Sequence, residues 1–220
     1  MGVILCIETA TTNCSVALGK EGKLLALKED YSNNYSHAER LHLFIDEILK
    51  ENDLTPNDLD AVAVSKGPGS YTGLRIGVSA AKGLCFSLDI PLISVPTLSS
   101  LAKQVEKKAG DFVIPLLDAR RMEVYTAGFD SDFKQIFDTR AQILDETSFM
   151  EYLDQGQVTF IGNGVEKFQK ICAHENAGFI IGKLPSAAEM VRLATEKFAT
   201  KDFEDVAYFE PYYLKDFMAG

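Results

Sequence analysis

The chain has 220 residues and a mass of 24.2 kDa; 46% of its residues are apolar and 25% are charged. This size and balance suit a folded globular protein, and no apolar run approaches the ~20 residues of a membrane span. The net charge of -10, with a pI of about 4.8, is unfavourable for holding nucleic acid alone. We therefore expect any RNA to be held through a partner.

The first half of the chain predicts three antiparallel strands, followed by alternating helices and strands. Val3 to Ile7 is a short β-branched run that ends at Glu8 before a cluster of threonines, as a buried strand entering a turn does. Ser36 and Glu39 form a capping box ahead of an apolar stripe, which predicts an amphipathic helix. The predicted elements are strands at 3–7, 14–18 and 24–28, a helix from 36, a helical turn at 55–56, a strand at 61–64, a helix ending near 88, a strand at 91–95 and a helix at 96–107.

The second half predicts the same plan. Its expected elements are strands at 112–117 and 123–129, a third strand, a helix at 147–153, a strand at 158–161, a Gly-Asn-Gly turn with a helix, a strand at 179–181 and a helix from 186. Glu8 and Asp118 lie 110 positions apart, and each ends the first strand of its half, VILCIE or VIPLLD. We therefore predict an α/β fold of two ribonuclease H-like lobes, the duplicated βββαβα plan of actin, hexokinase and Hsp70. Three successive strands without crossover helices exclude a Rossmann sheet.

The repeat predicts two lobes, at residues 1–108 and 109–204. The aromatic tail at about 205–220, which contains PYYLKDF, either packs back on the first lobe or contacts a partner.

Four cysteines, Cys6, Cys14, Cys85 and Cys172, are far apart and form no CxxC pair, which indicates free thiols of a reducing compartment. The N-terminus has no basic segment and Glu8 interrupts its apolar run, so a signal peptide is not expected. The predicted location is the cytoplasm.

The turns that follow the two acids are candidate phosphate-binding sites. In duplicated folds of this kind the two turns face each other and hold phosphates, while the acids hold a metal or position water. The candidate nucleotide-binding residues are Glu8, Thr9, Thr11, Thr12, Asp118, Gly162 and Gly164. Short polar residues also simply suit a tight turn, which is the alternative interpretation. A nucleotide phosphohydrolase or phosphotransferase stays open as a function, although 220 residues leave little room for segments that enclose a substrate.

The stretch GPGSYTGLRIG, at 67–77, lies between a predicted strand and a predicted helix. Its glycines allow close approach to a phosphate or to another backbone, but their spacing matches neither a Walker loop nor a dinucleotide fingerprint. Small residues continue to Gly83, which predicts close packing of this helix against another, within the fold or across an interface.

Other catalytic arrangements have little support. His37 and His42 are five positions apart on a predicted helix, so their rings diverge and no metal site is expected there. No serine lies in a GxSxG context and no cysteine has a recognisable base nearby, so nucleophilic hydrolysis is not indicated.

Segments spread over essentially the whole chain resemble the bacterial TsaB (YeaZ) family. They are ILCIETATTNCSVALG, SHAERL, GPGSYTGLRIGVSAAKGL, IPLISVPTLSSLA, DARRMEVY, IGNGVEKF and PYYLK. The resemblance implies a non-catalytic subunit for making N6-threonylcarbamoyladenosine beside the anticodon of tRNAs that read codons starting with A. It implies the paralogue TsaD as heterodimer partner, the ATPase TsaE in a larger assembly, a homodimer when alone, tRNA only through the complex, and no membrane. No cofactor is implied, with weak ATP or ADP binding left open.

TsaD carries the metal-binding pattern HHMEGH where this chain has Pro96 to Leu101. Thr97 and Leu101 stand where imidazoles are needed, so the same metal site is not expected. Two departures from the usual TsaB pattern are mild: Glu8 stands where Asp is common and Tyr71 where Phe is common.

The resemblance also implies that the helices after SHAERL and after GPGSYTG pack against TsaD or a second copy. The candidate interface residues are His37, Glu39, Leu41, Phe44, Ile45, Ile48, Tyr71, Leu74, Arg75, Ile76, Val78 and Leu84, with His37, Glu39 and Arg75 on a polar rim. For each apolar member the alternative is a place in the protein's own core.

Overall fold

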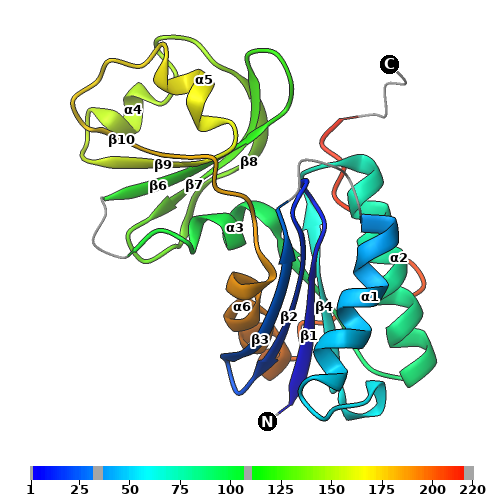
Figure 1. Cartoon of the computed structure of the whole chain (residues 1–220). Helices are drawn as coiled ribbons and strands as arrows, with labels where there is room; N and C mark the ends of the chain where they lie inside the picture. Colours follow the sequence, from blue (N-terminus) through cyan, green and yellow to red (C-terminus); the bar gives the residue numbers. More distant parts are fainter. Residues whose placement is uncertain (1, 32–36, 107–110, 216–220) are drawn as a thin grey trace. The chain divides into compact units, whose positions relative to one another are not determined.

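The computed structural model describes residues 2–31, 37–106 and 111–215. The chain forms two compact units (Figure 1). Unit 1 comprises Met1–Ser100 and Pro185–Gly220, and unit 2 comprises Leu101–Leu184. The chain therefore leaves unit 1 once and returns to it.

Unit 1 is built on a five-stranded mixed sheet of order β3-β2-β1-β4-β5. Its strands are β1 (Val3–Glu8), β2 (Cys14–Lys20), β3 (Lys23–Asp30), β4 (Ala61–Gly67) and β5 (Leu92–Pro96). The first three strands pair antiparallel, and β4 and β5 continue the sheet in parallel to β1. Every residue of β1 is buried, because β1 is central and helices cover both faces of the sheet (Figure 1).

The two faces of this sheet carry separate apolar clusters. Leu5 and Ile7 of β1 pack on the side of α1 (His37–Lys50) and α2 (Tyr71–Leu88). Ile4 and Cys6 point to the opposite face, against α6 (Ala187–Thr200). Successive side chains of a strand alternate between faces, so one continuous apolar strand supplies both clusters.

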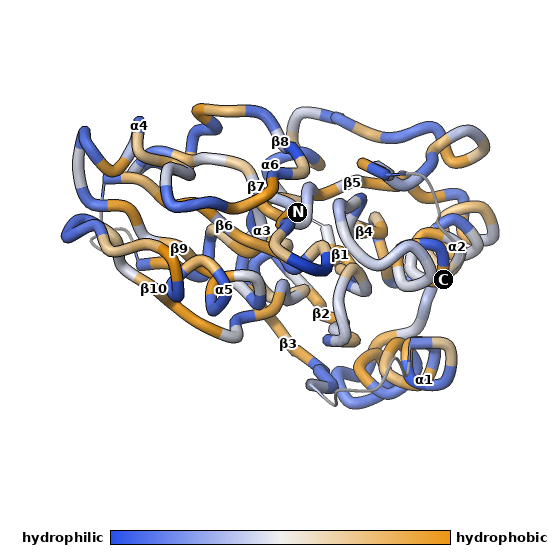
Figure 2. The backbone as a smooth tube through the Cα atoms, turned by 90° about the horizontal axis from the view of Figure 1, so that it is seen from above, coloured by the Kyte–Doolittle hydropathy of each residue, from blue (hydrophilic) through white to orange (hydrophobic). Residues whose placement is uncertain are grey.

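Unit 2 repeats the sheet, with the order β10-β9-β6-β7-β8. Its elements are β6 (Phe112–Asp118), β7 (Glu123–Asp130), β8 (Gln135–Ile143), α4 (Met150–Leu153), β9 (Val158–Gly162), α5 (Val165–Gln169) and β10 (Ala177–Ile181). Its core is aromatic, with Phe149, Phe160 and Phe168 in mutual contact. The hydropathy colouring of Figure 2 follows this arrangement, with apolar residues along the central strands and alternating polar and apolar residues along α1. The predicted α/β fold with two ribonuclease H-like lobes is confirmed.

The predicted lobe boundaries are wrong at the C-terminal side. The second lobe was expected to reach residue 204, whereas residues 185–204, including α6, belong to unit 1. The reason is the apolar face of α6, whose buried residues Met190 and Val191 join the cluster around Ile4 and Cys6. The first boundary also lies at Ser100 rather than at 108. The described tail residues belong to unit 1, where Glu204 N donates to Leu92 O and Tyr212 N donates to Lys66 O. That the tail contacts a partner stays a prediction.

Two further predicted elements change. The helix expected at 96–107 is the shorter α3 (Thr97–Ala102), and the chain continues from it in turns that donate to Leu101 O and Ala102 O. The helical turn expected at 55–56 is a short 3-10 helix, Pro56–Asp58. The capping box assigned to Ser36 lies outside the described residues. In the described part of the chain, no helix combines the length and apolarity needed to cross a membrane.

Candidate functional site

The glycine-rich loop before α2 packs on the turn between β1 and β2. Ser70 caps α2 by accepting from Gly73 N, and its own N–H donates to Ala10 O at 2.6 Å. Thr9 Oγ1 donates to Gly73 O at 2.8 Å. A Cβ added at Gly73 or Gly77 would collide with Thr9, and one added at Gly69 would collide with Ala10. The glycines therefore serve close approach to the protein's own backbone, and the chain itself occupies the space beside this turn.

His37, at the start of α1, is buried and forms a hydrogen bond with the same turn. Its ring Nε2 lies 2.7 Å from Thr11 O and donates to it. Burial lowers the pKa of His37, so the ring favours its neutral form. The prediction that His37 lies on an exposed polar rim is wrong, because its side chain is covered by the unit's own residues.

Glu8 ends β1 in full burial. Its Oε1 accepts from Ala10 N at 2.6 Å and from Ser65 Oγ at 2.8 Å, whereas Oε2 has no hydrogen-bond partner among the described residues. Burial raises the pKa of Glu8 to about 7, and the hydrogen bonds from Ala10 and Ser65 oppose that rise. Glu8 and Thr9 are both fully buried. Neither side chain reaches the surface, so their contact with a nucleotide stays a prediction that their burial does not support.

Asp118 ends β6 in the equivalent position of unit 2, but it is exposed. Its Oδ1 accepts from Arg120 N at 2.8 Å, as Glu8 accepts from the residue two positions on, and it pairs with Lys167 Nζ at 2.7 Å. Its N–H donates to Asn163 Oδ1 at 2.9 Å. Asp118 thus already has a cationic partner and closes its own turn.

Two of the remaining candidate nucleotide-binding residues are glycines that pack closely against the backbone. A Cβ at Gly162 would meet Leu116 O, and one at Gly164 would meet both Leu116 O and Val124. Thr11 is buried and Thr12 is partly buried. Close packing therefore accounts for both glycines of the Gly-Asn-Gly turn without a phosphate.

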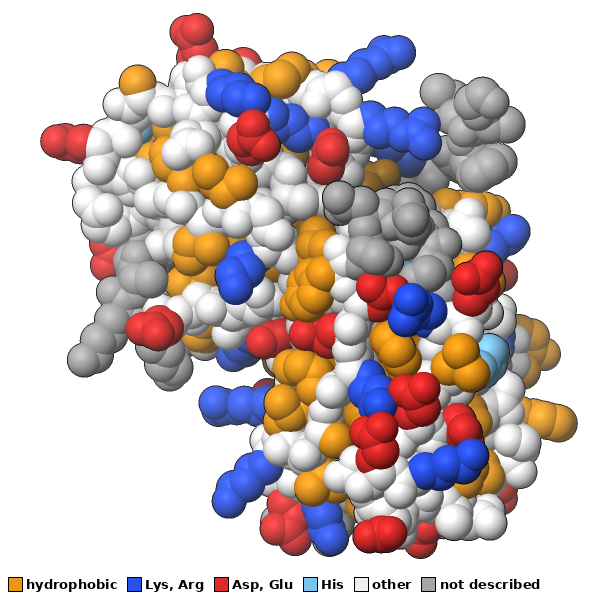
Figure 3. All heavy atoms as spheres, viewed as in Figure 1, with side chains coloured by type: hydrophobic (Ala, Val, Ile, Leu, Met, Phe, Trp, Pro, Cys, Tyr) orange, Lys and Arg blue, Asp and Glu red, His pale blue; other side chains and the backbone are white. Residues whose placement is uncertain are grey.

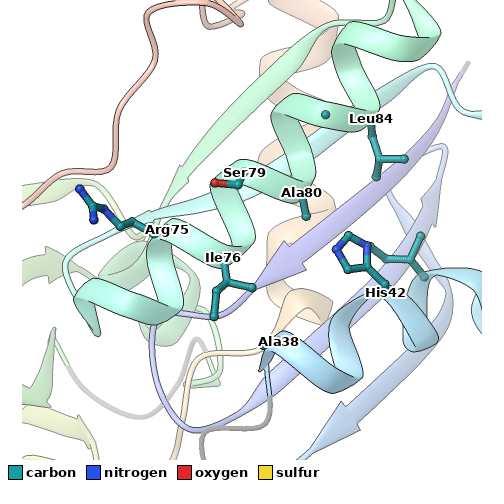
Figure 4. Close-up of a pocket in the computed structure, with 9 residues that line it drawn as sticks. Ala38, His42, Arg75, Ile76, Ser79, Ala80 and Leu84 are labelled. Carbon is teal, nitrogen blue, oxygen red and sulfur yellow. The ribbon is translucent and has the colours of Figure 1, made fainter.

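A groove of about 600 Å³ lies between α1 and α2 (Figure 4). Ala38, His42 and Ile45 of α1 line one side, and the residues from α2 are Arg75, Ile76, Ser79, Ala80, Gly83 and Leu84. In Figure 4 the side chains of His42 and Ile76 project into the space between the two helices.

Four of the nine residues that line the groove have small side chains or none: Ala38, Ser79, Ala80 and Gly83. Gly83 is the informative residue, since a Cβ at this position would meet no atom within 4 Å. Glycine in a helix interior costs about 1 kcal/mol relative to alanine. Nothing in the described structure requires that cost, unlike at Gly77, where a Cβ would collide with Thr9.

The predicted interface residues divide into two groups. Ile45, Arg75, Ile76 and Leu84 line the groove, and Glu39, Phe44 and Tyr71 are exposed or partly exposed beside it. His37, Leu41, Ile48, Leu74 and Val78 are buried and do not line the groove, whereas Ile45 is buried but does line it. The burial of these five beneath the groove does not fit direct contact with a partner.

Sequence reasoning missed several groove residues. Ala38, His42, Ser79, Ala80 and Gly83 line the groove but are not in the predicted interface, although the run of small residues up to Gly83 predicts close helix packing. Phe86 does not line the groove, but it is 85% exposed and lies seven residues after Ser79, on the same helix face. An exposed phenylalanine in line with small residues was the available signal.

The outer face of α1 is engaged in charge pairs. Lys28 of β3 pairs with Glu47 and Glu51, and Arg40 pairs with Asp30. Figure 3 shows acidic and basic side chains intermixed on this face of unit 1. The charged face and the groove therefore occupy different sides of α1.

Comparison with known proteins fits this architecture. A family model described as "TsaD: tRNA N6-adenosine threonylcarbamoyltransferase" matches residues 32–219. The tRNA threonylcarbamoyladenosine biosynthesis protein TsaB of Haemophilus influenzae is 31% identical over 97% of this chain and 93% of that protein. The TsaB of Escherichia coli is 33% identical over 98% of this chain and 96% of its own length.

Solved structures agree with these relatives. YeaZ from Pseudomonas aeruginosa is 25% identical, with a TM-score of 0.84 over 97% of this chain and 100% of the other. A second crystal structure, titled as an uncharacterized protein with similarity to peptidase YEAZ from Pseudomonas aeruginosa, has 26% identity and a TM-score of 0.87 over 98% of this chain and all of the other. On sequence and fold together, the chain belongs to the TsaB (YeaZ) family of tRNA threonylcarbamoyladenosine biosynthesis proteins, within the wider TsaD-type family.

Proposed function

We propose that this protein is the non-catalytic partner subunit of the transferase that attaches threonylcarbamoyl to tRNA adenosine, and that it binds a TsaD-type subunit through the groove between α1 and α2. The observation that carries the proposal is the groove itself, with small side chains on its walls and open space over Gly83. Helices that present small residues allow a second helix to approach closely, so that shape complementarity supplies the affinity.

The family relation supports a TsaD-type occupant. One family model, named for TsaD, spans residues 32–219, so a TsaD-type protein has counterparts of both α1 and α2. Two related helix pairs can pack face to face about an approximate two-fold axis, as identical pairs do in a homodimer. The same face then serves a homodimer when the TsaD-type partner is absent.

Three features support a non-catalytic role. Thr97 and Leu101 offer a hydroxyl and an alkyl group where the TsaD pattern has imidazoles. Thr97 Oγ1 is already used, since it accepts from Gly67 N at 3.1 Å. Glu8 is buried and Asp118 is paired with Lys167, so both strand-end acids serve their own turns.

The substrate and the other members of the assembly follow from the same proposal. The substrate is the adenosine beside the anticodon of tRNAs that read codons starting with A, TsaE joins the assembly, and this acidic chain contacts tRNA only within the complex. The chain needs no cofactor of its own.

The docking proposal is tested by a pair of tryptophan substitutions on different faces of the helix pair. Ser79→Trp fills the groove and is expected to abolish measurable binding to the TsaD of the same organism in calorimetry. Leu43→Trp is the control, because Leu43 is 58% exposed on α1 and does not line the groove. If Ser79→Trp and Leu43→Trp are both folded and Ser79→Trp binds TsaD as tightly as wild type does, the proposal is contradicted.

The absence of a cofactor requirement is tested separately. Calorimetry of the free chain with ATP and magnesium is expected to give no micromolar binding. Micromolar binding that Asp118→Ala abolishes would favour a nucleotide phosphohydrolase or phosphotransferase instead.

A further inference from the structure

The C-terminal tail of unit 1 runs along α2, and its last described residues lie near the start of that helix. Lys82 Nζ, in the middle of α2, donates to Ala207 O at 3.0 Å and to Phe209 O at 3.1 Å. Farther along, Tyr212 N donates to Lys66 O at 2.7 Å, just before the glycine-rich loop. The tail is therefore held by hydrogen bonds to the middle of α2 and to the end of β4.

At the end of this path, Tyr213 contacts the first residue of α2. The Tyr213 and Tyr71 rings have centroids 4.7 Å apart and an interplanar angle of 37°. Arg75 lies one helical turn after Tyr71, and its guanidinium carbon is 4.5 Å from the Tyr71 ring centroid. Three side chains from the tail and α2 thus form a contiguous set, which we call the Tyr213–Tyr71–Arg75 stack.

The stack fixes a cation at the rim of the groove. Arg75 lines the groove, is exposed, and in Figure 4 leaves α2 on the side away from α1. Among the described residues its guanidinium makes no hydrogen bond or ion pair, and its contact with Tyr71 is through the ring face. Its N–H donors remain available to a ligand, while the stack restricts the rotamers of a long side chain.

A fixed and exposed guanidinium is well suited to binding a carboxylate. The five donors of arginine form a planar fork that binds a carboxylate with two parallel hydrogen bonds. A side chain already held in its bound orientation loses less entropy when the ligand arrives. A carboxylate on a helix seated in the neighbouring groove meets both conditions.

We propose that Arg75 receives an Asp or Glu carboxylate of the TsaD-type partner, and that Tyr213 of the tail acts as a positioning residue by holding Arg75 through Tyr71. This inference rests on the proposed function, because it names a specificity contact of the same groove. The C-terminal tail is thereby part of the docking surface without touching the partner through Tyr213 itself.

The experiment is calorimetry of the full chain with the TsaD of the same organism at low and high salt. Arg75→Ala is expected to weaken binding by about tenfold and to reduce its salt dependence, because an exposed charge pair is lost. Tyr213→Ala is expected to weaken binding about threefold, and Tyr213→Phe to restore it, because the ring and not the hydroxyl makes the stack. Tyr208→Ala is the matched control, since Tyr208 belongs to the same tail and is 85% exposed.

The positioning role has its own readout in a double-mutant cycle. The Arg75→Ala/Tyr213→Ala double variant is expected to bind no more weakly than Arg75→Ala, because Tyr213 acts only through Arg75. Fully additive losses would overturn the positioning role. So would equal binding by Tyr213→Ala, Tyr208→Ala and wild type.

Arg75→Lys covers the case in which Tyr213→Ala fails to fold. Lysine keeps the charge without the planar fork, so we expect it to bind about as weakly as Arg75→Ala. Binding by Arg75→Lys equal to that of wild type overturns the carboxylate assignment. If wild type does not bind TsaD at all, the proposed function fails, whereas wild-type binding with unaffected Arg75 variants removes only the inference about the stack.

Discussion

Glu8 and Asp118 occupy equivalent strand ends but have opposite environments. Each accepts a hydrogen bond from the backbone N–H two residues on. Glu8 accepts from Ser65 Oγ and is fully buried, whereas Asp118 is exposed and paired with Lys167. The same residue class in the same turn therefore stabilises local structure in both units, while only Glu8 bears the cost of desolvation.

Burial of Glu8 predicts a specific pH dependence of stability. Its pKa is raised from 4.5 to about 7 in the folded chain, so between these values the folded state holds a proton that the unfolded state has lost. The contribution of Glu8 to the free energy of unfolding is therefore fully present below pH 4.5 and falls as the pH rises to 7, by up to about 3 kcal/mol.

The measurement is urea denaturation of wild type and Glu8→Gln across this pH range. Other carboxylates titrate in both proteins, so the difference between the two curves isolates Glu8. We expect the stability of wild type relative to Glu8→Gln to decrease toward pH 7. A difference that does not change with pH contradicts the assigned environment of Glu8.

Two glycines of α2 are predicted to respond in opposite ways to alanine. Gly83→Ala should stabilise the free chain by up to about 1 kcal/mol, because its Cβ enters open space. Gly77→Ala should destabilise it by about 1–3 kcal/mol, because its Cβ collides with Thr9. Urea denaturation of both variants measures the two effects.

A larger side chain at Gly83 separates stability from binding. Gly83→Leu should leave the free chain at least as stable as wild type and weaken TsaD binding by about tenfold or more, since the close approach of a helix is blocked. Unchanged binding by a stable Gly83→Leu variant would mean that the partner does not cover this position.

At the scale of elements, α6 is the helix whose placement the sequence did not reveal. Its apolar stripe predicts an amphipathic helix, but such a stripe fits any apolar sheet face. The helix follows the last strand of the second repeat, so the repeat alone predicts that it belongs to the second lobe. The packing of α6 against β1, β2 and β5 of unit 1 depends on contacts between side chains that are far apart in the sequence.

Substitutions on α6 test this placement. Met190 is fully buried in the cluster with Ile4 and Cys6, so Met190→Ala is expected to cost about 2–5 kcal/mol in the free energy of unfolding. Arg192→Ala, on the exposed side of the same helix, should change it by less than about 0.5 kcal/mol. Hydrogen exchange should place the loss in unit 1 strands, and a loss confined to β6–β10 would contradict the placement.

Other elements were predictable because local signals agree with the tertiary structure. The strand-end acids and the repeat of strand order identified both sheets. For the groove, the family resemblance named its two helices and four of its lining residues, Ile45, Arg75, Ile76 and Leu84, but it did not separate these from buried residues of the same helices. Leu41 and Leu74 belong to the same apolar stripes as the groove residues, and small residues such as Ala38 and Gly83 carry no hydrophobic signal.

For the whole molecule, the division into units predicts which fragments fold. The core of unit 2 is made of residues between Phe112 and Phe179, so a fragment of residues 101–184 is expected to unfold cooperatively on its own. Residues 1–100 lack α6 and expose the face around Ile4, so they are expected to fold only when residues 185–220 are supplied. Circular dichroism on heating tests both, and independent folding of 1–100 would contradict the role of α6.

The central claim is that the chain assists threonylcarbamoyl transfer without performing it. The most direct measurement is threonylcarbamoyl transfer to tRNA by the TsaD and TsaE of the same organism, supplied with the activated intermediate, with and without this protein. We predict that modification requires both TsaD and this chain, that Ser79→Trp fails to support it, and that this chain alone modifies nothing. Equal modification in its absence, or modification by this chain alone, would contradict the account.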